Sequence, residues 1–143
     1  MSRPAKLIIY TNSFKHNLNV LKGKTKDAKI WACVKAGAYG HGMESIVEGL
    51  KEADGLAVLE VREAREAREL GWDKPILLLE GVFVRQELHN ISNLDLEIVV
   101  HNSQQIEWCL SSKEKFRKIW IKINSGMNRL GFKGSSPSFS VGI

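Results

Sequence analysis

Hydrophobic positions along the chain follow two alternating patterns. Short continuous apolar runs are typical of strands buried on both faces of a parallel sheet, whereas apolar positions spaced i, i+3, i+4 and i+7 are typical of amphipathic helices. The apolar runs predict five strands, at residues 30–34, 56–59, 76–79, 96–100 and 119–123. The helical spacing predicts four intervening helices, at residues 43–50, 61–70, 85–91 and 102–110. A further helical stripe covers residues 14–21, and Gly23 is expected to end it.

Two of the predicted helices carry more detailed signals. In the helix at 61–70, i, i+4 spacing predicts ion pairs of Arg62 with Glu66 and of Arg65 with Glu69 on the exposed side. In the helix at 102–110, Asn102 is expected to cap the N-terminus, with Gln105 three residues further on. The side of this helix expected to be buried consists of Ile106, Cys109 and Leu110.

The alternation of strands and helices predicts an α/β fold. Five strands separated by four helices, about 20 to 25 residues apart, indicate parallel βαβ units in an open sheet or a barrel. The regular spacing favours a partial (β/α)8 TIM-type barrel, since a complete barrel takes roughly 250 residues. We therefore assign residues 1–132 to the barrel part. Residues 133–143 have no helical period and are interpreted as an atypical tail produced by truncation or a frame disruption.

Composition narrows the class of protein. The 143 residues are 43% hydrophobic and 26% charged, as expected for one globular domain. No apolar run reaches the roughly 18 residues of a membrane span, and the N-terminus lacks a signal peptide's apolar core, so we expect a cytoplasmic protein with no membrane partner. The net charge is +5, but the lysine-rich run at 22–29 has no interleaved aromatic residues, and no nucleic-acid partner is expected. Cys33 and Cys109 are expected to be free thiols, and no metal site is predicted.

Lys35 is the first candidate for chemistry. It follows the first predicted strand, on the same face as Trp31 and Cys33, at the rim where barrel enzymes carry their active sites. A lysine there can simply extend into solvent. A neutral amine partly removed from water is instead a nucleophile toward aldehydes. The glycine-rich segment 37–42 leads into a helix, where free amides and the phenol of Tyr39 can hold a phosphate. Together these are the groups that pyridoxal phosphate requires.

A second candidate stretch spans residues 122–132. Lys122 lies on a strand expected to be buried, on the same face as Trp120 and Asn124, so it needs an anionic partner or chemical neutralisation. Arg129 follows in a turn flanked by glycines, and its guanidinium stays charged. The alternative is that Arg129 is an ordinary surface arginine.

Both stretches resemble signatures of one family. The segment 34–42, Val-Lys-Ala-Gly-Ala-Tyr-Gly-His-Gly, closely resembles the pyridoxal phosphate attachment motif of the alanine racemases, and residues 122–132 resemble their second signature. Weaker similarity extends from Ile9 to Phe132. The resemblance implies the barrel domain of a fold-type III pyridoxal phosphate enzyme, normally followed by a β domain and forming a homodimer.

The resemblance also implies roles for individual residues. Lys35 matches the lysine that binds the cofactor covalently and acts as the base for D-alanine. Tyr39 matches the tyrosine that binds the cofactor phosphate. Arg129 matches the arginine near the cofactor's phenolic oxygen and the substrate carboxylate, and Lys122 matches a lysine that is often carbamylated. Gly37 departs from the Asn or Asp usual in the motif, which we expect to loosen the loop that holds Tyr39.

The function implied by the resemblance is interconversion of L-alanine and D-alanine for cell-wall synthesis. The family's later barrel strands and second domain supply the arginine at the pyridine nitrogen and the opposite-face tyrosine base, and neither has a counterpart in these 143 residues. We therefore expect the chain alone to be inactive. The alternatives are a non-catalytic barrel protein that binds pyridoxal phosphate and an inert remnant.

Overall fold

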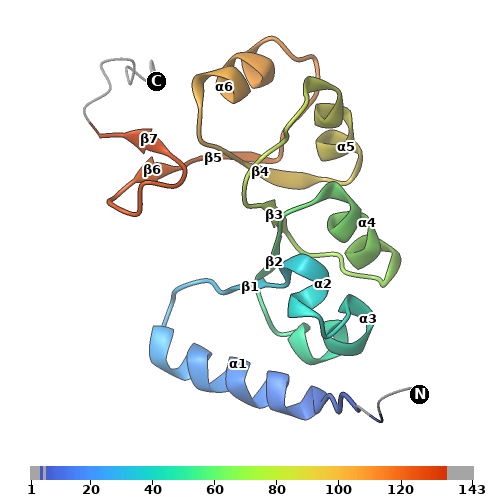
Figure 1. The fold of residues 1–143 in the computed structure, drawn as a ribbon. Helices are drawn as coiled ribbons and strands as arrows, with labels where there is room; N and C mark the ends of the chain where they lie inside the picture. Colours follow the sequence, from blue (N-terminus) through green and yellow to red (C-terminus); the bar gives the residue numbers. More distant parts are fainter. Residues whose placement is uncertain (1–3, 5, 135–143) are drawn as a thin grey trace.

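The chain folds as a curved five-stranded parallel sheet with most of its helices on one side, followed by a separate two-stranded sheet (Figure 1). The computed structural model describes residue 4 and residues 6–134. Strands β1 to β5 pair in chain order, each parallel to the next. The elements are α1 (Thr11–Thr25), β1 (Trp31–Cys33), α2 (Lys35–Tyr39), α3 (Met43–Ile46), the 3-10 helix η1 (Val47–Leu50), β2 (Gly55–Val58), α4 (Val61–Glu69), β3 (Ile76–Leu78), the 3-10 helix η2 (Arg85–Glu87), α5 (Leu88–Asn93), β4 (Leu96–Val100), α6 (Ser103–Leu110), β5 (Lys118–Ile121), β6 (Ile123–Asn124) and β7 (Phe132–Lys133).

This topology confirms the predicted α/β class and the part of a barrel formed by consecutive βα units. The register is regular: Leu56 of β2 pairs with Ile76 of β3, which in turn pairs with Leu96 of β4. A helix lies between each pair of consecutive strands from β1 to β5, as the hydrophobic pattern predicts. The sheet does not close, because the two outer strands, β1 and β5, are not paired with each other.

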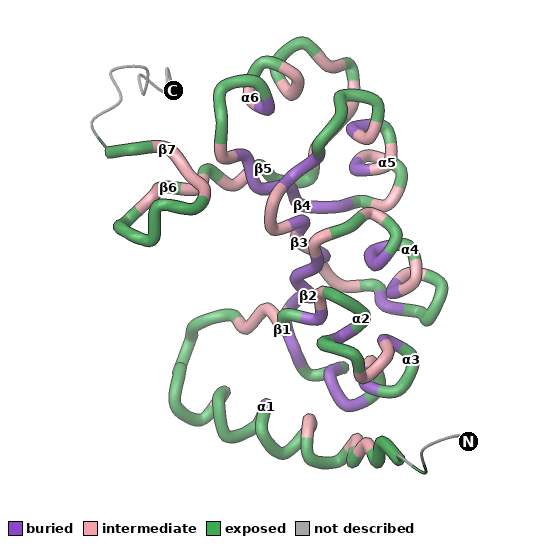
Figure 2. Tube along the Cα trace, in the orientation of Figure 1, coloured by how far each residue is buried: buried purple, intermediate pink, exposed green. Residues whose placement is uncertain are grey.

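The hydrophobic core lies between the middle strands and the helices that cover them (Figure 2). All residues of β2 and β4 are buried, since each strand has a strand neighbour on both sides and helices over one face. Helix α4 contributes Ala64 and Ala67, one turn apart and both fully buried. Their small side chains let the helix pack closely on the sheet.

The fifth predicted strand is present but not buried, which corrects the prediction. Ile119, Ile121 and Ile123 are 42%, 43% and 52% exposed, whereas Trp120 and Lys122 are half-buried. The alternation predicted for Trp120, Lys122 and Asn124 is therefore correct, but the outward isoleucines lack cover. Strand β5 pairs with β4 on one side only, so its other edge is free within the described part of the chain.

Two local predictions about the helices are wrong, and a third is confirmed. Gly23 does not end the first helix, which continues to Thr25 and ends at Lys26 with φ 50°. Leu110 is 81% exposed, and the residue that α6 buries is Gln105. The predicted cap of this helix is confirmed, since Asn102 accepts a hydrogen bond from the backbone amide of Gln105 at 2.9 Å.

The ion pairs predicted along α4 also form differently. Arg62 pairs with Glu60, just before the helix, at 3.3 Å rather than with Glu66. Arg65 donates to the side chain of Asn90 in α5 at 3.4 Å, so it joins two neighbouring helices. Tertiary partners here replace the partners expected one helical turn away.

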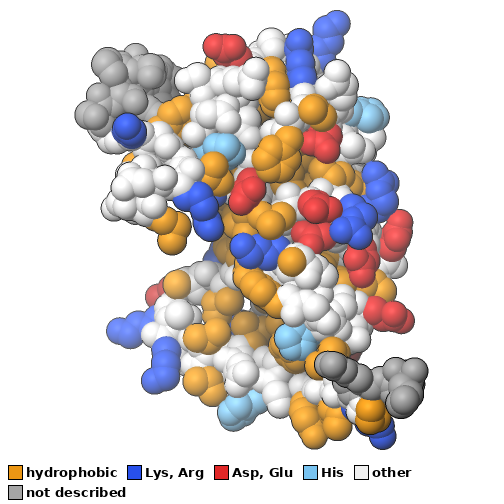
Figure 3. All heavy atoms as spheres, in the orientation of Figure 1, with side chains coloured by type: hydrophobic (Ala, Val, Ile, Leu, Met, Phe, Trp, Pro, Cys, Tyr) orange, Lys and Arg blue, Asp and Glu red, His pale blue; other side chains and the backbone are white. Residues whose placement is uncertain are grey.

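The proposed boundary after residue 132 falls inside the last described element. Phe132 and Lys133 form β7, which pairs with β6, and residues 135–143 of the predicted tail lie outside the described residues. No helix among the described residues is long and apolar enough to cross a membrane. On the face shown in Figure 3, acidic and basic side chains are interspersed over the helical side.

The exposed edge of β5 leads to a first prediction. Replacing Ile121 with Lys should slow aggregation of the 143-residue chain severalfold, because a charge on an unpaired edge strand opposes strand addition. Light scattering at several protein concentrations measures this. Leu110→Lys is the matched control, since Leu110 is more exposed but lies on α6. Equal protection by both variants would show that the strand edge is not the aggregating surface.

Candidate functional site

The sheet places the candidate residues at the carboxyl ends of its strands. Lys35 follows β1, Leu79 and Glu80 follow β3, and Lys122 follows β5. Because all five strands are parallel, these ends lie along one edge of the sheet. Two lysines from distant parts of the sequence are thus brought to the same end of the fold.

The segment after Lys35 forms a left-handed turn. Ala36, Gly37 and Ala38 have φ values of 53°, 59° and 55°, and Tyr39 also has a φ of 55°. Left-handed backbone costs roughly 1 to 2 kcal/mol for each residue that carries a Cβ atom. Glycine avoids this cost at position 37, so Gly37 fits the conformation of the turn. Strain of this kind is typical of functional sites.

The turn after Lys35 uses several of its own amides. The backbone amides of Gly40 and Gly42 donate to the carbonyl of Gly37, at 3.1 Å and 2.9 Å, and that of His41 donates to Ala38 at 3.2 Å. The helix that follows, α3, has only four residues. The amides of Gly40, His41 and Gly42 are therefore engaged within the turn, and the predicted phosphate site at the start of α3 stays a prediction.

Tyr39 remains a candidate for binding an anion. Its side chain is 60% exposed, and its hydroxyl lies 3.4 Å from the sulfur of Cys33 at the end of β1. The hydrogen bond with Cys33 raises the pKa of the Tyr39 phenol. The hydroxyl is therefore protonated at neutral pH and can donate a hydrogen bond to a phosphate.

Lys122 is held against the loop that follows β3. Its amine donates to the carbonyl oxygen of Leu79 at 2.6 Å. Burial lowers the pKa of Lys122, and the positive charges of Arg129 and Lys35 lower it further, against an opposing effect of Glu80. The two predicted lysines and the predicted arginine thus interact electrostatically in one region.

Arg129 lies in a loop between β6 and β7 that Asn124 organises. The side-chain oxygen of Asn124 accepts hydrogen bonds from the amides of Gly126 and Asn128, at 3.0 Å and 3.1 Å. Arg129 is exposed and lines a cavity of about 200 Å³ together with Lys122. The loop therefore presents a permanent cation beside an amine whose charge is destabilised.

Two buried polar side chains near the site carry contacts that the sequence did not reveal. Glu63 in α4 accepts a hydrogen bond from the amide of Gly37, and Gln105 in α6 donates to the carbonyls of Glu80 and Val82. Both residues are 3% exposed. Each lies in the first turn of a helix and contacts the loop of the preceding βα unit: Glu63 contacts the loop after β1, and Gln105 contacts the loop after β3. Buried polar residues at this helical position are the signal that could have identified them.

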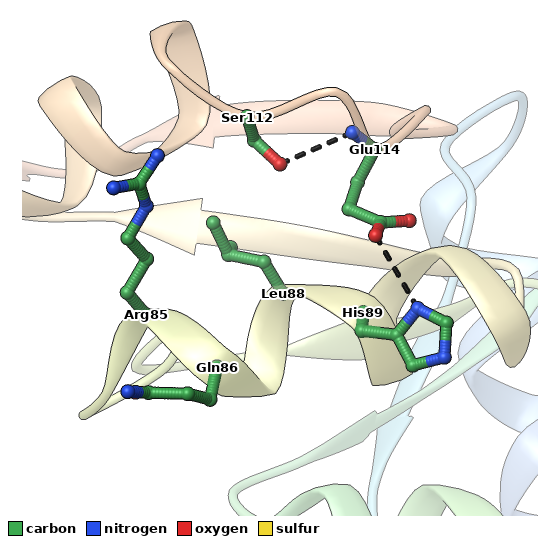
Figure 4. Close-up of a pocket in the computed structure, with 6 residues that line it drawn as sticks. All are labelled: Arg85, Gln86, Leu88, His89, Ser112 and Glu114. Carbon is green, nitrogen blue, oxygen red and sulfur yellow. Dashed lines mark hydrogen bonds and ion pairs between the residues drawn. The ribbon is translucent and has the colours of Figure 1, made fainter.

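A larger cavity lies elsewhere and contains none of the predicted residues. It measures about 320 Å³ and is lined by Arg85, Leu88, His89 and Glu114, among others (Figure 4). His89 and Glu114 pair across it at 3.3 Å. Glu114 precedes β5, so this cavity is at the opposite end of the strands from Lys122. Within residues 6–134, no three His, Cys, Asp or Glu side chains are grouped so as to hold a metal ion.

The fold and site define a class: part of a parallel β/α barrel with lysines at the strand ends. The family profile described as "Alanine racemase, N-terminal domain" matches residues 9–137, and the chain belongs to this family. It is 50% identical over 133 residues to the alanine racemase of Albidiferax ferrireducens and 47% identical over 133 residues to that of Variovorax paradoxus. Each match covers 92% of this chain and 36% of the relative, so the chain spans about a third of their length.

Solved structures agree with the sequence comparison. Alanine racemase from Acinetobacter baumannii superposes with a TM-score of 0.84 at 40% identity, over 87% of this chain and 36% of that chain. Alanine racemase from E. faecalis gives a TM-score of 0.81 at 30% identity, over 91% of this chain and 37% of that chain. Histidine racemase from Leuconostoc mesenteroides, 24% identical, covers 86% of this chain and 34% of that chain with a TM-score of 0.75, and shares the fold.

Two glycines, one in a left-handed turn and one inside a right-handed helix, give a second prediction. A Cβ atom at either Gly23 or Gly37 would meet no atom within 4 Å, so only the backbone distinguishes them. Gly37→Ala should lower the free energy of unfolding by about 1 kcal/mol, because φ is 59° there. Gly23→Ala, inside α1, should raise it by about 0.5 to 1 kcal/mol.

Denaturant unfolding followed by circular dichroism measures both changes. Gly37→Asn is the control for the turn, since asparagine tolerates left-handed backbone better than alanine and should be less destabilising. A stabilising effect of Gly37→Ala would show that residues 36–39 are not left-handed in solution.

Proposed function

We propose that this chain is the N-terminal part of a pyridoxal phosphate-dependent alanine racemase that interconverts L-alanine and D-alanine. The observation that carries the proposal is the position of Lys35 at the carboxyl end of β1, followed by the left-handed turn that carries Tyr39. Membership of the family supports the same reaction. A cytoplasmic homodimer that supplies D-alanine for peptidoglycan is part of the proposal.

The residues present fit the proposed cofactor. Lys35 is a half-buried amine that can bind the aldehyde, and the protonated phenol of Tyr39 can bind the phosphate. Arg129, which lines a cavity together with Lys122, supplies a permanent positive charge that would attract the phenolic oxygen and a substrate carboxylate. When bound, pyridoxal phosphate supplies an electron sink that makes the α-proton of alanine acidic.

In this proposal each residue has a separate task. Lys35 holds the cofactor and moves the α-proton on one face of the substrate, the face used for D-alanine. Arg129 orients the substrate carboxylate through charge-assisted hydrogen bonds. Lys122 would be carbamylated: its lowered pKa favours the neutral amine, which adds carbon dioxide and releases a proton to water, and the resulting anion would pair with Arg129. The barrel part is assigned to residues 1–132.

The third prediction concerns the attachment site. Pyridoxal phosphate added to the chain, followed by borohydride reduction and peptide mapping, should label Lys35. The label should be lost in Lys35→Ala and retained in Lys6→Ala, which changes an exposed lysine near the N-terminus. A label on Lys122 or Lys6, with Lys35 unmodified, contradicts the proposal.

The fourth prediction is that the 143-residue chain exchanges the α-proton without racemising alanine. Lys35 reaches one face of the substrate only, and loss of a positioned acid or base on the other face costs about 10²- to 10⁴-fold in rate. Solvent deuterium should enter D-alanine with retained configuration, followed by mass spectrometry and chiral chromatography. Efficient interconversion of both enantiomers by the purified chain would show that a second base is present.

A further inference from the structure

Glu63 is a buried carboxylate without a cationic partner in the described part of the chain. It is 3% exposed, and its hydrogen-bond partners among the described residues are backbone amides. One oxygen, Oε2, accepts from Leu59 at 2.9 Å and from Glu60 at 3.2 Å. The other, Oε1, accepts from Gly37 at 3.2 Å. A buried charge held only by backbone amides is an unusual arrangement, because burial of a charge is costly unless hydrogen bonds compensate.

The two oxygens have different tasks. Leu59 and Glu60 immediately precede α4, so their bonds to Oε2 belong to an ordinary helix start. Gly37 belongs to the preceding βα unit, 26 residues earlier in the chain. Capping of α4 accounts for the bonds of Oε2 but leaves the bond of Oε1 unexplained.

The contact with Gly37 is at the middle of the left-handed turn. Gly37 lies between Ala36 and Ala38, both of which carry a Cβ atom at positive φ. Its carbonyl already accepts the amides of Gly40 and Gly42, and its amide donates to Glu63. The carboxylate therefore fixes the centre of a strained segment to the rigid start of α4.

Helix α6 makes a similar contact with the preceding βα unit, but there the side chain donates hydrogen bonds and does not accept one. Gln105 occupies the same place after β4 that Glu63 occupies after β2, and it accepts the amide of His101 at 2.9 Å. Its nitrogen then donates to the carbonyls of Glu80 and Val82 in the loop after β3. A carboxylate serves where the loop presents an N–H group, and an amide serves where it presents carbonyls. Each side chain is thus complementary to the backbone groups of the loop that it contacts.

We infer that Glu63 is a positioning residue, whose carboxylate holds the left-handed turn and thereby sets the separation between the Lys35 amine and the Tyr39 hydroxyl. This inference rests on the proposed function, in which these two groups bind the aldehyde and the phosphate of one cofactor. A fixed separation favours a ligand that contacts both groups. Glu63 should therefore matter for pyridoxal phosphate and not for pyridoxal, which lacks the phosphate.

The principal variant is Glu63→Gln in the full 143-residue chain. Its side-chain oxygen can still cap α4, but its NH₂ group then faces the N–H of Gly37 and cannot accept from it. Glu63→Asp is the second variant, which keeps the charge and shortens the reach to Gly37 by one methylene. Arg68→Met is the matched control, since it removes the hydrogen bonds that Arg68 makes from the other end of α4 to the carbonyls of Leu94, Trp72, Lys74 and Asp95.

Two measurements test the inference. Hydrogen exchange read on peptides covering residues 35–42 should become about tenfold faster in both Glu63 variants and stay unchanged in Arg68→Met. Borohydride trapping at Lys35 across a concentration series should show about tenfold weaker binding of pyridoxal phosphate to the Glu63 variants. Binding of pyridoxal should change less than twofold.

Several outcomes would overturn the assignment. Unchanged exchange at 35–42 in both Glu63 variants would show that Glu63 only caps α4. An equal loss of pyridoxal phosphate binding in Arg68→Met would show a general effect of stability. Absence of any label on Lys35 in the unchanged chain would refute the proposed function, and the exchange measurement would still decide whether Glu63 holds the turn.

Discussion

Parallel pairing of the five strands is the constraint on which the rest of this structure depends. Each strand must be followed by a crossover before the next can begin in the same direction, so every strand ends at the same edge. Side chains that follow β1 and β5 are far apart in sequence but lie at the same end of the strands for this reason, and the curvature of the sheet turns its two outer strands toward each other. Leu56, Ile76 and Leu96 pair in register, so the carboxyl ends of β2, β3 and β4 are aligned with one another.

Gathering cations at this edge has an electrostatic consequence. Burial lowers the pKa of Lys122, and repulsion from the positive charges of Arg129 and Lys35 lowers it further. An anionic ligand, or conversion of Lys122 to an anion, relieves that repulsion. Binding of such a ligand is thereby coupled to the stability of the fold, because a ligand that binds only the folded state shifts the folding equilibrium toward it.

The sequence predicts the strands well because their apolar runs are short and continuous, and it predicts the inward face of Lys122 because alternation in a strand is strict. It does not predict the left-handed turn, since Ala36, Ala38 and Tyr39 carry no local signal for positive φ. The turn depends on contacts from a neighbouring unit, including the carboxylate of Glu63. Leu110 shows the same limit. The apolar periodicity of α6 predicts that Leu110 is buried, but Leu110 is exposed and the polar residue Gln105 is buried.

The two halves of the candidate site differ in how firmly the fold supports them. Lys35 and the turn are attached to β1, whose neighbour β2 is fully buried, and they are held by α4 through Glu63. Lys122 and Arg129 follow β5, whose isoleucines remain exposed and whose outer edge is unpaired within the described residues. Local stability falls where buried apolar contacts are few. The half that carries Lys35 is therefore joined to the buried part of the fold through Glu63, whereas the half that carries Arg129 follows a strand whose isoleucines are exposed.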